Sequence, residues 1–218
     1  MQAGYFEGDM NMEGLHETDR AATTDSKRLW PGGIIWYAVD STLDTSRIMR
    51  IIRRSMDWIE DKTCLRFIKR AHEKDYVRIV SKEGCYSYLG RNGGEQELSL
   101  GNGCHFVGTV THELLHAVGF FHEHSRPDRD DYIDIFPENI IKGFLSSFDK
   151  VEPSQIRYLT KFDYQSVMLY GSNAFSRGPD LPSMLTKDGR TLRDVYDKAG
   201  LSQSDIVRIN ALYNCKRT

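Results

Sequence analysis

The sequence predicts an α+β protein built as two lobes beside a cleft. Residues 33–100 combine strand-like runs with one amphipathic helical pattern, and residues 107–118 form a second helical pattern. From residue 120 to about residue 202 the helical periodicity is weak and turn residues are frequent, which indicates a loop-rich second lobe before a final helix. A chain of 218 residues can bury a core in one domain or in two lobes that share a cleft.

Each predicted element has a local signature. Runs rich in β-branched and aromatic residues near glycine or proline indicate strands, and apolar residues three and four positions apart after a capping side chain indicate helices. Strands are expected at residues 33–40, 76–80 and 95–100, with the glycine-rich segment 85–96 (CYSYLGRNGGEQ) making a turn. Helices are expected at residues 45–62, at residues 107–118, and after the capping box of residues 202–205 (SQSD).

The charge is nearly balanced but unevenly placed. The chain has 29 Lys and Arg against 31 Asp and Glu, and its basic residues do not alternate with aromatic ones, so nucleic acid is not an expected partner. No apolar run approaches the ~20 residues that a membrane span needs. Residues 1–20 carry five acids and one base, a net −4, which leaves +2 on the remainder. The leader is either a segment that docks on the body or a solvated tail.

The four cysteines are Cys64, Cys85, Cys104 and Cys215. None forms a C-x-x-C pair, so a cysteine-ligated zinc site is not indicated. The even count fits two disulfides and an oxidising compartment, with three pairings possible; four free thiols in a cytosolic protein are the alternative. The first residues show neither the basic nor the apolar region of a signal peptide, so a secreted protein would already have lost it.

The most specific pattern is the histidine cluster of residues 111–124 (THELLHAVGFFHEH). His112 and His116 lie one helical turn apart on the same face, which suits two nitrogen ligands on one metal ion. His122 can join them only if the helix ends first, and Gly119 can turn the chain through a positive φ. His124 is expected to be solvent-exposed. The alternative is a helix whose histidines lie at the surface or in the core. This alternative does not explain why Gly119 and Glu113 are present.

Three neutral imidazoles leave one coordination position open, which is typical of a catalytic zinc ion rather than a structural one. Glu113 is adjacent to His112 and can take a proton from a water that zinc has acidified, then pass that proton to a leaving amine. The pattern therefore predicts amide hydrolysis without a covalent intermediate. The competing hypotheses are a zinc-holding binding module without catalysis and a cytosolic metalloenzyme that acts on small molecules.

The chain resembles the astacin family of zinc metalloendopeptidases. Residues 112–132 (HELLHAVGFFHEHSRPDRDDY) match the astacin signature HExxHxxGFxHExxRxDRDxY at every fixed position. Residues 163–171 (DYQSVMLYG) are similar to the Met-turn of the family, and residues 29–33 (LWPGG) resemble the start of its mature domain. The resemblance covers nearly the whole chain.

This resemblance implies a metzincin, zincin-like fold with one active-site helix between two lobes. The N-terminal lobe, about residues 21–119, would hold a twisted mixed sheet and two long helices, and the C-terminal lobe would cover about residues 120–218. Met168 would lie beneath the zinc ion. Tyr170 would be a fifth zinc ligand that moves away to stabilise the oxyanion. Leu169 departs from the histidine usual in the family, which leaves the substrate contacts there open.

The resemblance also implies the disulfides Cys64–Cys215 and Cys85–Cys104, and hence secretion. Residues 6–9 (FEGD) match the F-x-G-D motif of astacin pro-segments, in which the aspartate, here Asp9, replaces the catalytic water on zinc. Residues 1–20 would be an inhibitory pro-segment and residues 21–218 the catalytic domain. A trypsin-like protease would cleave between Arg20 and Ala21, and the new amine of Ala21 would be buried near Glu123 as the partner that this carboxylate otherwise lacks.

The prediction from sequence is thus a secreted zinc metalloendopeptidase in its proenzyme form, with one zinc ion per chain. Its partners would be protein or peptide substrates and an activating protease. Substrates would bind in an extended conformation along an edge strand of the sheet, and residues 95–100 are the expected edge strand.

Overall fold

The computed structural model describes residues 7–11, 26–43, 45–155 and 157–216. A six-stranded sheet forms the first lobe, in the order β1-β5-β6-β4-β2-β3. The strands are β1 (Met10–Asn11), β2 (Ile34–Val39), β3 (Arg66–Lys69), β4 (Tyr76–Val80), β5 (Cys85–Tyr88) and β6 (Glu95–Leu100). Pairing is parallel except between β5 and β6, so the sheet is mixed.

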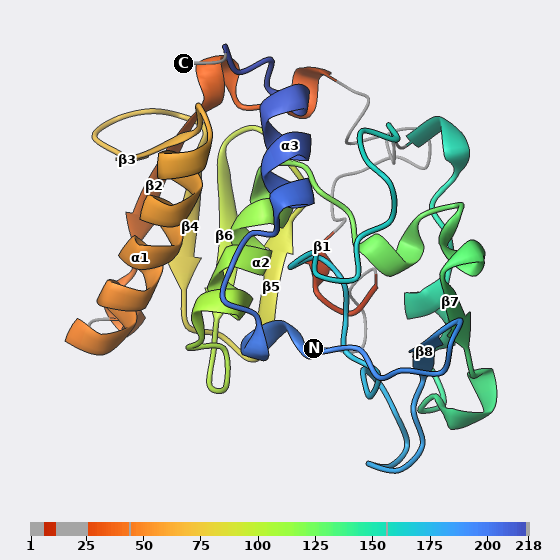
Figure 1. Cartoon of the computed structure of the whole chain (residues 1–218). Coiled ribbons are helices and arrows are strands. Elements are labelled where there is room, and N and C mark those ends of the chain that lie inside the picture. Colours follow the sequence, from red (N-terminus) through yellow and green to blue (C-terminus); the bar gives the residue numbers. More distant parts are fainter. Residues whose placement is uncertain (1–6, 12–25, 44, 156, 217–218) are drawn as a thin grey trace.

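Two helices cover one face of this sheet (Figure 1). Helix α1 (Ser46–Lys62) begins after Thr45, whose side chain accepts a hydrogen bond from the amide of Ile48. Its apolar residues at helical spacing are buried in the main core together with residues of α2 (Val107–Ala117) and of strands β2, β4 and β6. Burial of this amphipathic face is what holds α1 against the sheet, because helical stability in proteins comes mostly from packing.

The second lobe contains little regular structure. Its described residues include a short antiparallel pair of strands, β7 (Ile133–Ile135) with β8 (Met184–Thr186), and an apolar core of their own. Helix α3 (Gln203–Leu212) begins with the expected capping box, in which the side chains of Ser202 and Asp205 each accept a hydrogen bond from the other's main-chain amide. In the described part of this lobe the 3-10 helices are Glu123–Ser125, Arg129–Asp131, Pro137–Asn139, Leu145–Phe148, Pro153–Gln155 and Val195–Asp197.

The sheet differs from the sequence prediction at its edge. Residues 85–96 were expected to turn, but their first four residues form β5, and the turn follows at glycines 90, 93 and 94, which all have positive φ. Strand β6 was expected at the edge, and this expectation is wrong: β6 lies between β5 and β4. The edge strand on this side is β1 of the leader, which pairs in parallel with β5, the next strand of the sheet (Figure 1). No helix among the described residues is long and apolar enough to cross a membrane.

Both cysteine pairs form disulfides, Cys64–Cys215 and Cys85–Cys104. The first joins the end of α1 to the residues after α3, and the second joins β5 to the loop before α2. The Cys85–Cys104 bridge therefore holds β5 next to the helix that carries the histidines.

The longer disulfide loop is expected to contribute more stability. The bridged residues are 151 positions apart for Cys64–Cys215 and 19 apart for Cys85–Cys104. Chain entropy alone then predicts a loss of about 5 kcal/mol in the free energy of unfolding for the Cys64→Ser/Cys215→Ser variant, against about 3 kcal/mol for Cys85→Ser/Cys104→Ser. Urea denaturation of both variants measures the difference. Equal losses would contradict the dependence on loop length.

Candidate active site

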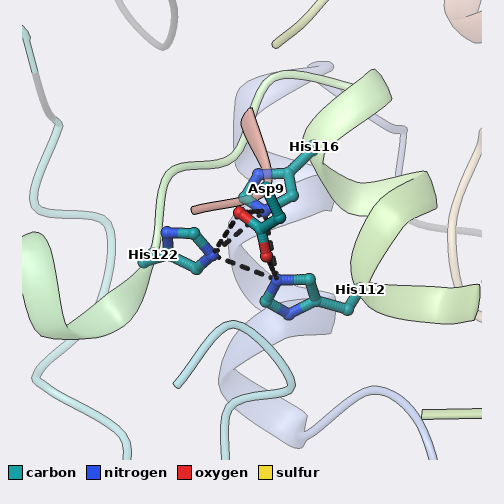
Figure 2. Close-up of side chains that lie close together, drawn as sticks. All are labelled: Asp9, His112, His116 and His122. Carbon is teal, nitrogen blue, oxygen red and sulfur yellow. Dashed lines mark hydrogen bonds and ion pairs between the residues drawn. The ribbon is translucent and has the colours of Figure 1, made fainter. Parts of the chain in front are cut away.

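Three histidines converge at the end of α2. His112 and His116 project from one face of the helix, and the helix ends at Ala117. Gly119 then has a φ of +107°, as its expected role requires, and His122 returns toward the other two rings. The three Nε2 atoms lie 3.1, 3.1 and 3.2 Å from one another, all buried (Figure 2).

The partners of the Nδ1 atoms determine how each imidazole ring is oriented. Nδ1 of His112 donates to the carbonyl of Val167 at 2.8 Å, and Nδ1 of His116 donates to the carbonyl of Phe120 at 2.7 Å. Because a carbonyl can only accept, these two Nδ1 atoms carry the hydrogen and leave the Nε2 lone pairs facing the centre. Nδ1 of His122 lies 2.5 Å from an oxygen of Glu7. Such outer partners orient the ligands of metal sites.

Asp9 of the leader enters the middle of the histidines (Figure 2). Its carboxylate oxygens lie 3.2 Å from Nε2 of His112, 3.2 Å from Nε2 of His122 and 3.6 Å from Nε2 of His116. The Tyr170 hydroxyl donates to Oδ2 of Asp9 at 2.6 Å and lies 3.0 Å from the carbonyl oxygen of Glu7. Oδ1 of Asp9 is buried and has no hydrogen bond among the described residues.

This donor set fits a zinc ion. Three imidazole nitrogens and one carboxylate oxygen lie within 4.8 Å of one another, and tetrahedral nitrogen and oxygen ligation is what zinc prefers. A carboxylate that is buried among three imidazole nitrogens also favours binding of a cation. His112, His116, His122 and Asp9 are therefore the residues that would hold zinc.

Protonation at the site agrees with this assignment. Burial lowers the pKa of His112 and lowers that of His116 to about 4, so both are neutral, as a ligand must be. Burial also lowers the pKa of His122, but the Asp9 and Glu7 carboxylates outweigh it and raise the pKa to about 9. The two carboxylates thus favour a positive charge at His122. A zinc ion at Nε2 would supply this charge in place of the proton.

Glu113 lies beside the histidines without contacting their ring nitrogens. Burial, and next the charge of Asp9, raise the pKa of Glu113 well above its ordinary value, and its Oε2 has no hydrogen bond among the described residues. Glu113 lines a pocket of about 360 Å³ together with His112, Tyr170 and Asp9. Because its other walls come from Thr109 of α2 and from residues 194–196 of the second lobe, this pocket is the cleft between the lobes.

A second set of contacts holds the turn that contains Met168. Oδ2 of Asp205 accepts from the amide of Val167 at 2.9 Å, and the Val167 carbonyl is the acceptor for His112. Nζ of Lys198 donates to the carbonyls of Ser166 and Leu169. Met168 is buried in the main core. Sequence reasoning placed Asp205 only in a helix cap and missed Lys198, because neither residue carries a local signal for a contact so far along the chain.

Two expectations about the residues after His122 need correction. His124 was expected to be exposed, but it is buried: its Nε2 donates to the carbonyl of Ser147 at 3.1 Å, and its ring stacks on Tyr170. Glu123 is buried as expected, but it does not lack a partner. Arg208 of α3 contacts both of its oxygens, at 2.6 and 2.7 Å, and the amide of Asp163 donates to it at 2.8 Å. Arg20 and Ala21 lie outside the described residues.

Replacing Arg208 by methionine is expected to lower the free energy of unfolding by about 3–5 kcal/mol, because it leaves Glu123 buried without its main cation. Urea denaturation measures the change. The double variant Glu123→Met/Arg208→Met removes both charges and should lose much less than the single variant. If the double variant were as unstable as Arg208→Met, the loss would come from packing rather than from the buried charge of Glu123 left without Arg208.

Known proteins are similar to this chain in sequence. The family model of astacin, peptidase family M12A, matches residues 22–214. Astacin-like metalloprotease toxin 1 from Loxosceles intermedia is 44% identical over 216 residues, which cover 96% of this chain and 80% of the toxin. Zinc metalloproteinase nas-6 from Caenorhabditis elegans is 43% identical over 196 residues, which cover 89% of this chain but only 56% of nas-6.

A solved structure shares the fold. High choriolytic enzyme 1, a hatching enzyme zinc-protease from Oryzias latipes, has a TM-score of 0.78 and 40% sequence identity to this chain, and the match covers 88% of this chain and 93% of that enzyme. The α+β metzincin fold expected from the sequence is confirmed by this likeness. By its sequence, its fold and its match to the family model, the chain belongs to the astacin family of zinc metalloproteases, peptidase family M12A.

Proposed function

We propose that this chain is the latent proenzyme of a secreted zinc metalloendopeptidase. Residues 1–20 act as an inhibitory pro-segment and residues 21–218 as the catalytic domain. The observation that carries the proposal is the position of Asp9, whose carboxylate lies within 3.2–3.6 Å of all three histidine Nε2 atoms. A carboxylate there fills the coordination position that a catalytic water needs.

The chemistry follows from the residues that surround the ion. When bound, zinc acidifies a water and polarises the carbonyl of the substrate. Glu113, which is buried and whose Oε2 accepts no hydrogen bond from the described residues, takes the proton from the attacking water and delivers it to the leaving amine. Tyr170 donates to the Asp9 carboxylate in the latent form, and once Asp9 leaves, its hydroxyl is free to donate to the developing oxyanion. A binding module without catalysis would need neither residue.

Substrates are proteins and peptides bound in an extended conformation. Strand β5 is the edge strand of the catalytic domain, and in the latent form β1 covers it through a parallel pairing of Met10 with Ser87 and Asn11 with Tyr88. Extended peptides bind exposed sheet edges through main-chain hydrogen bonds. The leader therefore excludes substrate from the sheet edge as well as from the metal.

Activation is proposed to occur by cleavage between Arg20 and Ala21 by a trypsin-like protease. The new amine of Ala21 would enter the small cavity of about 40 Å³ that Glu123, Arg126 and Arg208 line. There it would join Arg208 as a partner of Glu123 rather than fill a vacant position. Two disulfides and no free cysteine among the described residues fit an oxidising, extracellular location.

Limited trypsin treatment tests this function. Zinc content and peptide hydrolysis are measured before and after treatment, with Arg20→Gln as the matched variant that trypsin does not cut at this bond. One zinc ion per chain is expected in both forms, with hydrolysis only after cleavage that leaves Ala21 at the N-terminus, and none in Arg20→Gln. Absence of zinc, and no hydrolysis from the cleaved chain when zinc is added, would overturn the proposal.

A further inference from the structure

Glu7, the residue two positions before Asp9, is buried against the metal site. Its Oε2 lies 2.5 Å from Nδ1 of His122, and both side chains are fully buried. Glu7 adopts a φ of +52° and Gly8 a φ of +91°, and a positive φ is uncommon for a residue with a side chain. This tight turn brings two carboxylates to opposite sides of one imidazole: Glu7 to Nδ1 and Asp9 to Nε2.

The outer partner of His122 therefore comes from the leader. His112 and His116 donate their Nδ1 hydrogens to Val167 and Phe120, which belong to the catalytic domain. The partner that the structure gives Nδ1 of His122 is Glu7. A carboxylate in this position fixes the tautomer of the ring and makes it a stronger donor to a metal than a carbonyl partner does.

Charge balance couples this contact to the metal. Two carboxylates buried against one imidazole would be costly without a cation between them, and Oε1 of Glu7 has no hydrogen bond among the described residues. A divalent ion at the three Nε2 atoms matches the two negative charges of Glu7 and Asp9. Docking of the leader and binding of zinc should then favour each other, and by thermodynamic linkage by the same factor in both directions.

We propose that Glu7 is a positioning residue that orients the zinc ligand His122 and makes the latent form hold zinc more tightly than the cleaved form does. The inference rests on the proposed latency, because it needs the leader docked over the metal. It adds a second carboxylate with a separate role: Asp9 would contact the ion, whereas Glu7 would act through His122.

Zinc release from the uncleaved chain tests this role. The rate of zinc transfer to a chromogenic chelator is measured for wild type, Glu7→Gln, Glu7→Ala and Asp9→Ala, with Glu138→Gln at an exposed carboxylate as the control. Removal of an outer partner typically weakens metal binding about 10- to 100-fold, so Glu7→Ala should release zinc faster by about that factor. Glu7→Gln keeps an acceptor for Nδ1 but not the charge, and should fall between Glu7→Ala and wild type.

Two further measurements distinguish the orientation of His122 by Glu7 from undocking of the leader. Absorption spectra of the cobalt-substituted uncleaved chains should change in Glu7→Gln while the chain stays inactive, which shows an altered ligand field under a docked leader. After cleavage next to Arg20, wild type and Glu7→Gln become the same polypeptide and must release zinc at one rate.

The possible outcomes are distinct. If Glu7→Gln and Glu7→Ala release zinc at the wild-type rate while Asp9→Ala releases it faster, the role of Glu7 is wrong and the Asp9 lock stands. If Asp9→Ala also behaves as wild type and remains inactive, the proposed latency itself fails. A faster release in Glu7→Ala alone, with Glu7→Gln unchanged in release and spectrum, would reduce Glu7 to a packing residue and overturn the positioning role.

Discussion

Replacing Glu113 by glutamine is expected to lower kcat of the cleaved enzyme by about 10²- to 10⁴-fold, the range that a positioned general acid and base contributes. Glutamine keeps the size and shape of the side chain but cannot take a proton from the attacking water. The side chain of Glu113 is buried and lines the cleft pocket, and its Oε2 accepts no hydrogen bond from the described residues, so no described group competes with a proton for this oxygen. The measurement is steady-state hydrolysis of a peptide by equal amounts of zinc-loaded enzyme.

Zinc content is the control, because it separates loss of the general base from loss of the metal ion. Glu113 is not among the residues whose ligand atoms converge on the proposed ion, so Glu113→Gln should bind zinc as wild type does. His116→Ala is the matched contrast, because it should lose both zinc and activity. Wild-type activity in Glu113→Gln would leave the reaction without its proposed base and would reopen the choice of mechanism.

The parts of the fold that follow from the sequence are those with local signals. The helix of residues 107–118 was expected from its pattern, and α2 ends within one residue of that range. Gly119 has a positive φ, and this turn lets His122, six residues after His116, return to the other two histidines, which a straight helix would not allow. In both cases the spacing of a few neighbouring residues is enough to predict the local structure.

The expectations that failed depend on contacts distant in sequence. Strand β5 has a short pattern beside several glycines, and only its pairing with β6 and β1 makes it a strand. His124 is buried because Ser147 and Tyr170 come from other loops to meet it. The contact of Glu7 with His122, 115 residues later, could not be predicted either. Glu7 occupies the variable position of the motif F-x-G-D and has no local signal.

The Asp9 lock predicts activity without cleavage once it is weakened. In the Asp9→Ala variant of the uncleaved chain the leader loses its contact with the metal site and the hydrogen bond from Tyr170. Hydrogen bonds to charged groups contribute about 1.5–3 kcal/mol, so the equilibrium between docked and undocked leader should shift about 10- to 150-fold toward the undocked state. Hydrolysis by the uncleaved Asp9→Ala chain should rise by a similar factor and remain below that of cleaved enzyme, because β1 still pairs with β5. An uncleaved Asp9→Ala chain as inactive as wild type would contradict the lock.

Gly8→Ala weakens the same lock without removing a charge. A Cβ on Gly8 would lie 2.2 Å from Cζ of Phe175, at a φ of +91° that side chains rarely adopt. Phe175 cannot move aside cheaply, because its ring stacks on Phe144 and meets Phe148 edge to face. Gly8→Ala should therefore also release activity from the uncleaved chain while Asp9 remains present. If Asp9→Ala activates the uncleaved chain and Gly8→Ala does not, the fit of the turn against Phe175 contributes nothing to latency.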